Sequence, residues 1–315
     1  MLITSLGELL VDFLPIAEDG RTTGFSMHAA GAPYNVAVGL SRLGQKVAFA
    51  GKISTDLFGR YLRESAESEG IDLRFLLPDE APSTLAFVAM EHGEPVYAFY
   101  DQGAADTMLA IDEVPAALFE ETSILHFGSI SLLRGTTPAA VAAVAERLKG
   151  RALLSFDPNV RPGVVRDEEG YRAMLNLIFS IADMVKLSAA DVGWIAPGEN
   201  VEQFALDLAG RGPSLVAITQ GSAGVLAVRG EETWRLPAVP VEIVDSVGAG
   251  DAFSAGLIAG LAERDVTSRQ ALAELPGQEI EASLRFASVV AAVTCTRAGA
   301  DPPRRDELMG MWGEM

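Results

Sequence analysis

The stretch Asp245-Ser-Val-Gly-Ala-Gly-Asp-Ala-Phe-Ser-Ala-Gly-Leu257 runs from a glycine-containing loop into an apolar segment of helical length. Gly248 and Gly250 leave the backbone free to curl, so successive N–H groups can converge at the start of the helix. With the positive end of the helix dipole, these groups predict an anion site that needs no Lys or Arg. Asp251 is expected beside the anion, where its carboxylate can take a proton from a hydroxyl that attacks phosphorus. The alternative is a glycine-rich loop with Asp251 as an ordinary N-cap.

Outward from this stretch, short apolar runs alternate with longer segments of helical period. The runs typical of buried strands are Leu2–Gly7, Val47–Gly51, Ile124–Gly128, Ala152–Asp157, Met184–Ser188 and Leu215–Gln220. The helical segments are Asn35–Leu43, Phe58–Glu69, Pro138–Lys149, Tyr171–Ile181, Val201–Ala209, Ala249–Ala262 and Glu279–Cys295. This alternation predicts an α/β fold with a mostly parallel central sheet and helices on both faces.

Some regions break the alternation. Thr22–Ala30 has little helical period, and Thr84–Ala89 with Val96–Tyr100 predicts a hairpin that turns at residues 92–94. These segments are expected to form a small β layer outside the main sheet. A β-meander is expected over Gly224–Val228 and Thr233–Leu236. We find no linker long enough to separate independent domains.

Composition excludes several classes of function. Of 315 residues, 43 are Asp or Glu and 24 are Lys or Arg, which gives a formal net charge of −19. Nucleic acid or an anionic membrane is therefore not expected as the main partner, since both require positive charge. The single cysteine, Cys295, excludes an internal disulfide and a thiolate zinc cluster. With no apolar run of the ~20 residues that span a membrane and no apparent signal peptide, we expect a cytoplasmic protein.

The quoted stretch resembles the C-terminal signature of the ribokinase-like carbohydrate kinases, the PfkB family, and within it bacterial fructokinases most of all. Further matches follow in the family's order, and they are residues 30–37, 51–59, 156–162 and 219–224. The resemblance implies a three-layer α/β/α sandwich, as a single kinase domain over residues 1–315. It also implies a discontinuous β lid from about residues 10–30 and 84–104. The implied activity is ATP-dependent phosphorylation of a sugar hydroxyl.

The resemblance also assigns roles in the reaction and in sugar binding. Asp251 is the expected general base, and Gly248, Ala249 and Gly250 supply the expected anion hole. The residues expected to bind the sugar are Asp12, Gly31, Asn35, Phe99, Arg161 and Asp251 itself. Asp12 comes just past the first strand, where parallel sheets place ligand groups, and its carboxylate can accept hydrogen bonds from two hydroxyls. The alternatives are a turn position for Asp12, a helix start for Asn35, packing for Phe99 and a surface ion pair for Arg161.

A second set of residues is expected to bind ATP. It comprises Asn159, Lys186, Thr219, Gly221, Gly224, Gly248 and Gly250. An apolar wall for adenine is expected around Val239–Val244 and the helix near Ala287. The alternative for Lys186 is an ordinary solvated lysine.

Two kinds of metal ion are implied. Mg²⁺ would bridge the phosphates of ATP and keep several waters. The family's acidic position near Lys186 is Ala189 here, with Asp191 two residues later as a candidate replacement. A monovalent cation, K⁺, would be held largely by backbone oxygens at Asp245, Val247, Arg297 and Gly299.

Fructose, phosphorylated to fructose 6-phosphate, is the favoured sugar. Asp101 stands where deoxygluconate kinases often have Arg, and its charge should oppose an acidic sugar. Ser129 stands where ribokinases tend to have Glu. Ribose, 2-keto-3-deoxygluconate and a non-catalytic sugar sensor remain alternatives, whereas a dinucleotide-dependent dehydrogenase would need a glycine-rich turn after the first strand. A homodimer through the β lid is expected.

Overall fold

The computed structural model describes residues 1–18, 21–91 and 94–308, which form two β-sheets and their surrounding helices. The larger sheet has the strand order β13-β12-β11-β10-β9-β8-β1-β4-β5. Its strands are β1 (Leu2–Leu6), β4 (Val47–Ser54), β5 (Asp72–Asp79), β8 (Thr122–Gly128), β9 (Leu153–Asp157), β10 (Met184–Ser188), β11 (Leu215–Thr219), β12 (Val225–Arg229) and β13 (Glu232–Leu236). Neighbouring strands from β11 to β5 run parallel, and only β12 and β13 pair antiparallel.

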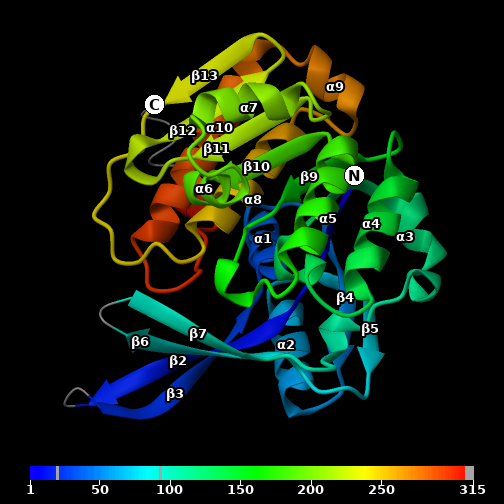
Figure 1. Cartoon of the computed structure of the whole chain (residues 1–315), viewed down its shortest axis with the longest axis vertical. Coiled ribbons are helices and arrows are strands. Elements are labelled where there is room, and N and C mark those ends of the chain that lie inside the picture. The colour runs from blue at the N-terminus through cyan, green and yellow to red at the C-terminus, as the bar shows by residue number, and fades with distance from the viewer. Residues whose placement is uncertain (19–20, 92–93, 309–315) are drawn as a thin grey trace.

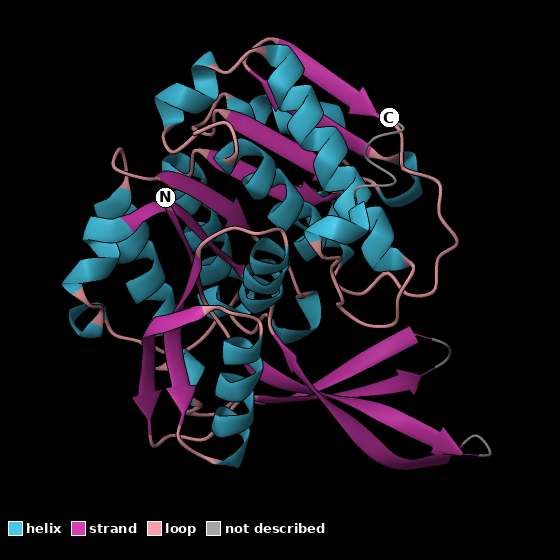
Figure 2. Ribbon diagram, turned by 180° about the vertical axis from the view of Figure 1, so that it is seen from behind, coloured by secondary structure: helices cyan, strands magenta, loops and turns pink. Residues whose placement is uncertain are grey.

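Helices cover both faces of this sheet (Figure 2). They are α1 (Ala32–Arg42), α2 (Leu57–Ser68), α3 (Ala116–Glu121), α4 (Thr137–Leu148), α5 (Glu168–Ile181), α6 (Ala189–Ile195), α7 (Val201–Ala209), α8 (Ala249–Ala262), α9 (Arg269–Glu274) and α10 (Gly277–Cys295). Because successive strand residues point to opposite faces, Ile124 belongs to the core under α1, α8 and α10, and Leu125 to the core under α4, α5 and α7. The expected three-layer α/β/α arrangement is confirmed.

The smaller sheet, which we call the lid, projects from one end of the main body (Figure 1). Its strands are β2 (Leu10–Glu18), β3 (Arg21–Ala30), β6 (Leu85–Glu91) and β7 (Glu94–Tyr100), in the order β3-β2-β6-β7. Asp12 pairs with Ala86, and Ala86 pairs with Phe99. Paired residues lie on the same face of a sheet, so Asp12 and Phe99 share one face of the lid. Of the turn expected at 92–94, His92 and Gly93 lie outside the described residues.

The structure contains elements that the sequence patterns did not predict. β5, the edge strand of the larger sheet, has charged residues at both ends and Pro78 within it, so it lacks the continuous apolar run of the central strands. α3, α6 and α9 are each too short for a helical period to stand out. α1 begins three residues before the predicted start, because Pro33 fits the first turn of a helix.

No helix among residues 1–18, 21–91 and 94–308 has the length and apolarity that crossing a membrane requires.

Candidate active site

The side chains expected to take part in the reaction gather at one edge of the central sheet. Since the strands from β1 to β11 are parallel, their carboxyl ends share this edge, where ligands bind in open α/β sheets. Glu8 follows β1, Ser129 follows β8, Asn159 and Arg161 follow β9, and Gly221 follows β11. The lid covers the same edge, with Asp12 and Phe99 turned toward it.

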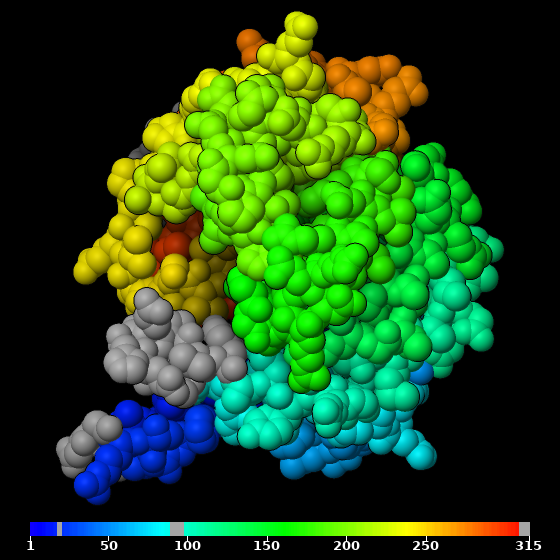
Figure 3. Space-filling view, viewed as in Figure 1, coloured from blue at the N-terminus to red at the C-terminus, as the bar shows by residue number. Residues whose placement is uncertain are grey.

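Two cavities of about 460 Å³ each meet at the start of α8. Every residue expected to bind the sugar lines the first cavity, which we therefore call the sugar cavity. These residues are Asp12, Gly31, Asn35, Phe99, Arg161 and Asp251. The second, which we call the nucleotide cavity, is lined by Thr219, Gly221 and Gly224, by the loop around Val239–Ile243, and by Ser288–Cys295 of α10. In Figure 3 the red atoms of the chain's last third lie deep in a hollow bordered by yellow atoms.

The first turn of α8 separates the two cavities. Gly248 and Asp251 line the sugar cavity, whereas Ala249 and Gly250 line the nucleotide cavity. Gly248 is the N-cap, with a left-handed φ of 76°, and no side chain caps this helix end. Ala249 N donates to the carbonyl oxygen of Ser246 over 3.3 Å, whereas the N–H groups of Gly250 and Asp251 have no acceptor within the helix and are available to an anion.

Asp251 is held in a defined orientation. Its Oδ2 accepts a hydrogen bond of 2.8 Å from Asn35 Nδ2, and its Oδ1 accepts one of 3.3 Å from Asn159 Nδ2. Burial raises the pKa of Asp251 to about 6, although the hydrogen bond from Asn35 opposes the shift. Near neutral pH the carboxylate is thus ionised and can accept a proton.

Lys186 lies directly beneath the anion-binding turn. Its Nζ makes a buried ion pair of 2.9 Å with Asp157 Oδ2, and Ser254 Oγ donates to the same oxygen over 3.2 Å. A Cβ on Gly250 would stand only 2.8 Å from Lys186 Nζ. Burial alone would lower the pKa of Lys186, but neighbouring carboxylates, Asp157 foremost, hold that pKa above its usual value. Lys186 therefore adds positive charge below the turn, and its direct contact with a nucleotide stays a prediction.

Asp191 is occupied by the backbone. Its Oδ1 accepts a hydrogen bond from Val160 N over 2.7 Å, and its Oδ2 accepts bonds from Ser188 N and Ser188 Oγ, both 2.6 Å. Asp191 thus caps α6 and anchors the segment after β9. No group of three or more His, Cys, Asp or Glu side chains in the described ranges could hold a metal ion. The residues do not fit a magnesium site made by the protein alone.

Asp12 and Arg161 both line the sugar cavity. Burial raises the pKa of Asp12 to about 6, and the charge of Arg161 partly opposes this. Gly31, with φ 122°, is required next to them, because a Cβ there would stand 2.5 Å from the Glu8 carbonyl oxygen.

The loops expected to hold a monovalent cation lie together. Gly299 N donates to Asp245 Oδ2 over 2.9 Å, and Val247 N donates to Asp245 Oδ1 over 3.0 Å. Arg297 reaches outward to Asp301 and Glu307 through its guanidinium, which leaves its backbone as the only part suited to a cation.

Comparison with known proteins decides the family. Residues 2–307 match the pfkB family carbohydrate kinases. The chain belongs to that family. It is therefore a carbohydrate kinase, an enzyme that transfers a phosphoryl group to a hydroxyl group of a sugar.

Individual relatives of this sugar kinase include fructokinases. It is 35% identical over 312 residues to a fructokinase of Klebsiella pneumoniae, with 96% of each chain covered. An ATP-bound fructokinase structure from Xylella fastidiosa superimposes with a TM-score of 0.92 at 29% identity, covering 99% of this chain and 98% of that one. A double mutant of Vibrio cholerae fructokinase, with fructose, ADP and potassium bound, gives a TM-score of 0.82 at 27% identity, covering 95% and 93%.

Glu8 is a residue of the kinase's sugar cavity that sequence reasoning left without a role. Its Oε1 accepts a hydrogen bond from Ala32 N over 3.2 Å, and its Oε2 accepts one from Ser131 N over 3.1 Å. Burial raises the pKa of Glu8 to about 7. The signal was present, because a carboxylate directly after a buried strand lies at the ligand-binding edge of a parallel sheet.

Contrary to the expectation from the sequence, Asp101 is not placed to repel an acidic sugar. Asp101 forms an ion pair with Arg134, which neutralises its charge. Its side chain is also not among the described residues that line the sugar cavity.

Proposed function

We propose that this sugar kinase transfers the γ-phosphoryl group of ATP to the 6-hydroxyl of fructose, as one kinase domain with a lid. The observation that carries the proposal is the start of α8, where Asp251 faces one cavity while Ala249 and Gly250 face the other. A phosphoryl group crossing this turn would meet a base on one side and the N–H groups at the start of α8 on the other.

The reaction follows from these positions. Asp251 takes the proton of the sugar hydroxyl, whose oxygen attacks the γ-phosphorus while the bond to the β-phosphate oxygen breaks and ADP leaves. The backbone N–H groups of α8 stabilise the charge that develops on the transferred group. Asn35 and Asn159 orient the carboxylate. Closure of the lid would exclude water that otherwise competes for the phosphoryl group.

The assignment of ATP and fructose is supported by relatives. The Xylella fructokinase structure contains ATP, and the Vibrio fructokinase structure contains fructose and ADP. An acidic sugar such as 2-keto-3-deoxygluconate is the second candidate, because Arg161 lines the sugar cavity and Asp101 is neutralised.

Both metal ions belong to the proposal. Since Asp191 is fully engaged, Mg²⁺ would be held by the phosphates and water and would offset phosphate charge. K⁺ would be held by backbone oxygens of the two loops joined by the Gly299–Asp245 hydrogen bond. The potassium-bound Vibrio structure supports that choice of cation. A cytoplasmic location stays a prediction from the sequence.

We also propose a homodimer through the outer face of the lid. The face turned away from the sugar cavity carries Phe13, Phe25, Met27, Phe87 and Tyr100. The rings of Phe13 and Phe87 stack at 4.6 Å, yet Phe25 is 44% and Tyr100 65% exposed. A second copy could cover this apolar face with the same face of its own lid.

A panel of sugars tests the proposed function. Purified protein is given ATP, Mg²⁺ and either fructose, ribose, glucose or 2-keto-3-deoxygluconate, and both ADP and phosphorylated sugar are measured. We expect the highest kcat/KM with fructose and a product phosphorylated at the 6-position. Highest turnover with the acidic sugar would replace fructose as the substrate, whereas binding of a sugar without any ADP formation would identify a sensor.

A further inference from the structure

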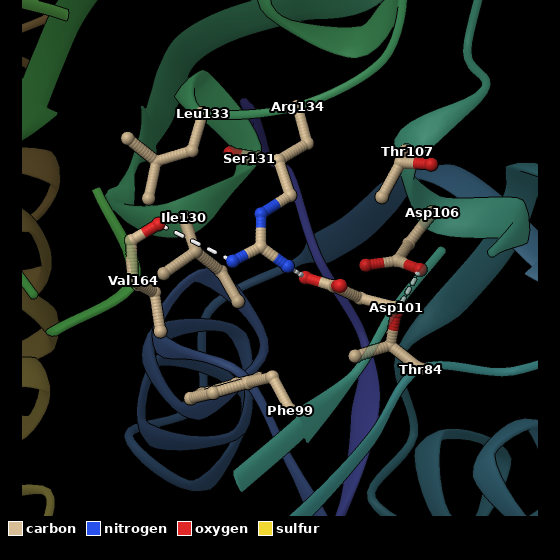
Figure 4. Close-up of a pocket in the computed structure, with 10 residues that line it drawn as sticks. All are labelled: Thr84, Phe99, Asp101, Asp106, Thr107, Ile130, Ser131, Leu133, Arg134 and Val164. Atoms are coloured by element: carbon tan, nitrogen blue, oxygen red, sulfur yellow. Dashed lines mark hydrogen bonds and ion pairs between the residues drawn. The ribbon is translucent and has the colours of Figure 1, made fainter. Parts of the chain in front are cut away.

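A buried polar cluster lies behind the sugar cavity at the root of the lid (Figure 4). We call Thr84, Asp101, Asp106 and Arg134 the latch cluster. Thr84 immediately precedes β6 and Asp101 immediately follows β7, so the β6–β7 hairpin enters and leaves the lid between them. Asp106 belongs to the short 3₁₀ helix Ala105–Thr107, which packs on β4 of the central sheet. The cluster therefore joins the lid to the main body.

Arg134 binds two separate segments at once. Its Nη1 pairs with the carboxylate of Asp101, and its Nη2 donates a hydrogen bond of 3.2 Å to the carbonyl oxygen of Val164. Figure 4 shows the guanidinium lying between these two groups. The ion pair is largely buried, with side-chain exposures of 17% for Arg134 and 8% for Asp101. A planar guanidinium holds two acceptors in a fixed relative geometry.

Both segments that Arg134 joins contribute to the wall of the sugar cavity. Phe99, two residues before Asp101, and Val164 line both the sugar cavity and the space around the latch cluster. Ile130 completes the shared wall. Arg134 itself is not among the described residues lining either of the two ligand cavities. It can therefore act on the sugar only through the wall that it holds.

The other end of the hairpin is fixed separately. Thr84 Oγ1 donates a hydrogen bond of 2.6 Å to Asp106 Oδ1, and Thr137 Oγ1 donates one of 2.8 Å to the carbonyl oxygen of Asp106. With Thr84 tethered in this way, loss of Arg134 would remove a support from the β7 end of the hairpin alone. Phe99 would stay paired with Ala86 of β6, but Asp101, two residues after Phe99, would no longer be held toward Val164.

We propose that Arg134 is a positioning residue for the sugar, which holds Phe99, through Asp101, at a fixed distance from Val164. The proposal rests on the function proposed above. It assigns Arg134 to sugar affinity and not to nucleotide affinity or to the chemical step, because the Gly248–Asp251 turn and the nucleotide cavity share no residue with the latch cluster.

The test compares steady-state kinetics of three variants with the wild-type enzyme. Arg134→Met removes the bridge but leaves Asp101 buried without a counter-charge, which destabilises a protein. The double variant Asp101→Asn/Arg134→Met removes the bridge without an unpaired charge. Arg166→Met is the matched control. Arg166 and Arg134 line the same surface pocket, but Arg166 has no hydrogen bond or ion pair with a described residue.

We expect the double variant to raise the KM for the sugar at least about tenfold while the KM for ATP stays within about twofold of wild type. Its melting temperature should lie near that of wild type, and Arg166→Met should match wild type in both KM values. A sugar KM unchanged in the double variant would overturn the proposal, and so would an equal rise in both KM values. A wild-type enzyme that turns over no sugar would instead refute the proposed function, and the role of Arg134 with it.

Discussion

Asp251 combines three properties that a general base in a kinase needs. It faces the sugar cavity, its two oxygens are held by Asn35 and Asn159, and its pKa is raised to about 6 by burial. A base with a pKa just below the working pH is ionised and still basic enough to take a proton. The amide side chains orient the carboxylate without neutralising it.

This environment predicts the pH dependence of turnover. The pKa of Asp251 in the folded enzyme is raised, so lowering the pH through about 6 protonates the base and should decrease kcat. Asp12, whose pKa burial also raises to about 6, titrates in the same range but is proposed to act in sugar binding. At saturating fructose, the acid limb of kcat should persist in Asp12→Asn. A kcat profile that is flat from pH 5 to pH 8 in the wild-type enzyme (~1 unit below to ~2 above this pKa) would exclude a titrating base.

At the scale of elements, the first turn of α8 depends on its glycines. A Cβ at position 250 would stand 2.8 Å from Lys186 Nζ, so Gly250→Ala must shift either the turn or the lysine. We expect kcat to fall at least ~10-fold, because the N–H groups facing the phosphoryl group are displaced. The matched control is Gly193→Ala in α6, where an added Cβ meets no atom within 4 Å. Equal kcat values in the two variants would show that the turn does not need glycine at 250.

The two loops beside α8 predict a dependence on potassium. Replacing KCl by tetramethylammonium chloride at constant ionic strength should lower kcat/KM several-fold, since the bulky organic cation cannot be coordinated by backbone oxygens. A third assay in sodium chloride at the same ionic strength gives an intermediate case. An enzyme that works equally well in all three salts would contradict the cation site at Asp245, Val247, Arg297 and Gly299.

The helices and strands that carry the candidate site could be predicted, because each has the residue pattern typical of its own secondary structure. The apolar segment Ala249–Ala262 is α8 with the predicted bounds, and the strand Met184–Ser188 is β10. What could not be predicted is which side chains meet across long sequence distances. Asp191 follows Lys186 by five residues, yet its carboxylate accepts hydrogen bonds from Val160 and Ser188. Only the fold brings Asp101 to Arg134.

At the scale of the whole molecule, the lid leaves part of an apolar face uncovered within the single chain, beyond the contact of Phe13 with Phe58 of α2. Phe25 is 44% exposed on β3, next to the stacked rings of Phe13 and Phe87. We expect a sedimentation mass of twice the 33.3 kDa chain at micromolar concentration. Phe25→Asp should give the monomer mass, because a carboxylate in the interface would lose its hydration.

The matched control for the dimer is Leu177→Asp, which places the same charge on an exposed leucine of α5 in the main body. This variant should sediment as the dimer. A monomeric wild-type protein, or dissociation caused equally by both substitutions, would contradict an interface made by the lid.

Replacement of one carboxylate oxygen of Asp251 by an amide nitrogen tests the central claim most directly. Asp251→Asn keeps an oxygen that can accept the hydrogen bond from Asn35 but removes the proton acceptor. We predict that kcat for fructose and ATP falls at least ~10²-fold while the KM for fructose changes little. Turnover within about threefold of wild type would show that the hydroxyl loses its proton to some other group, and the assigned mechanism would be wrong.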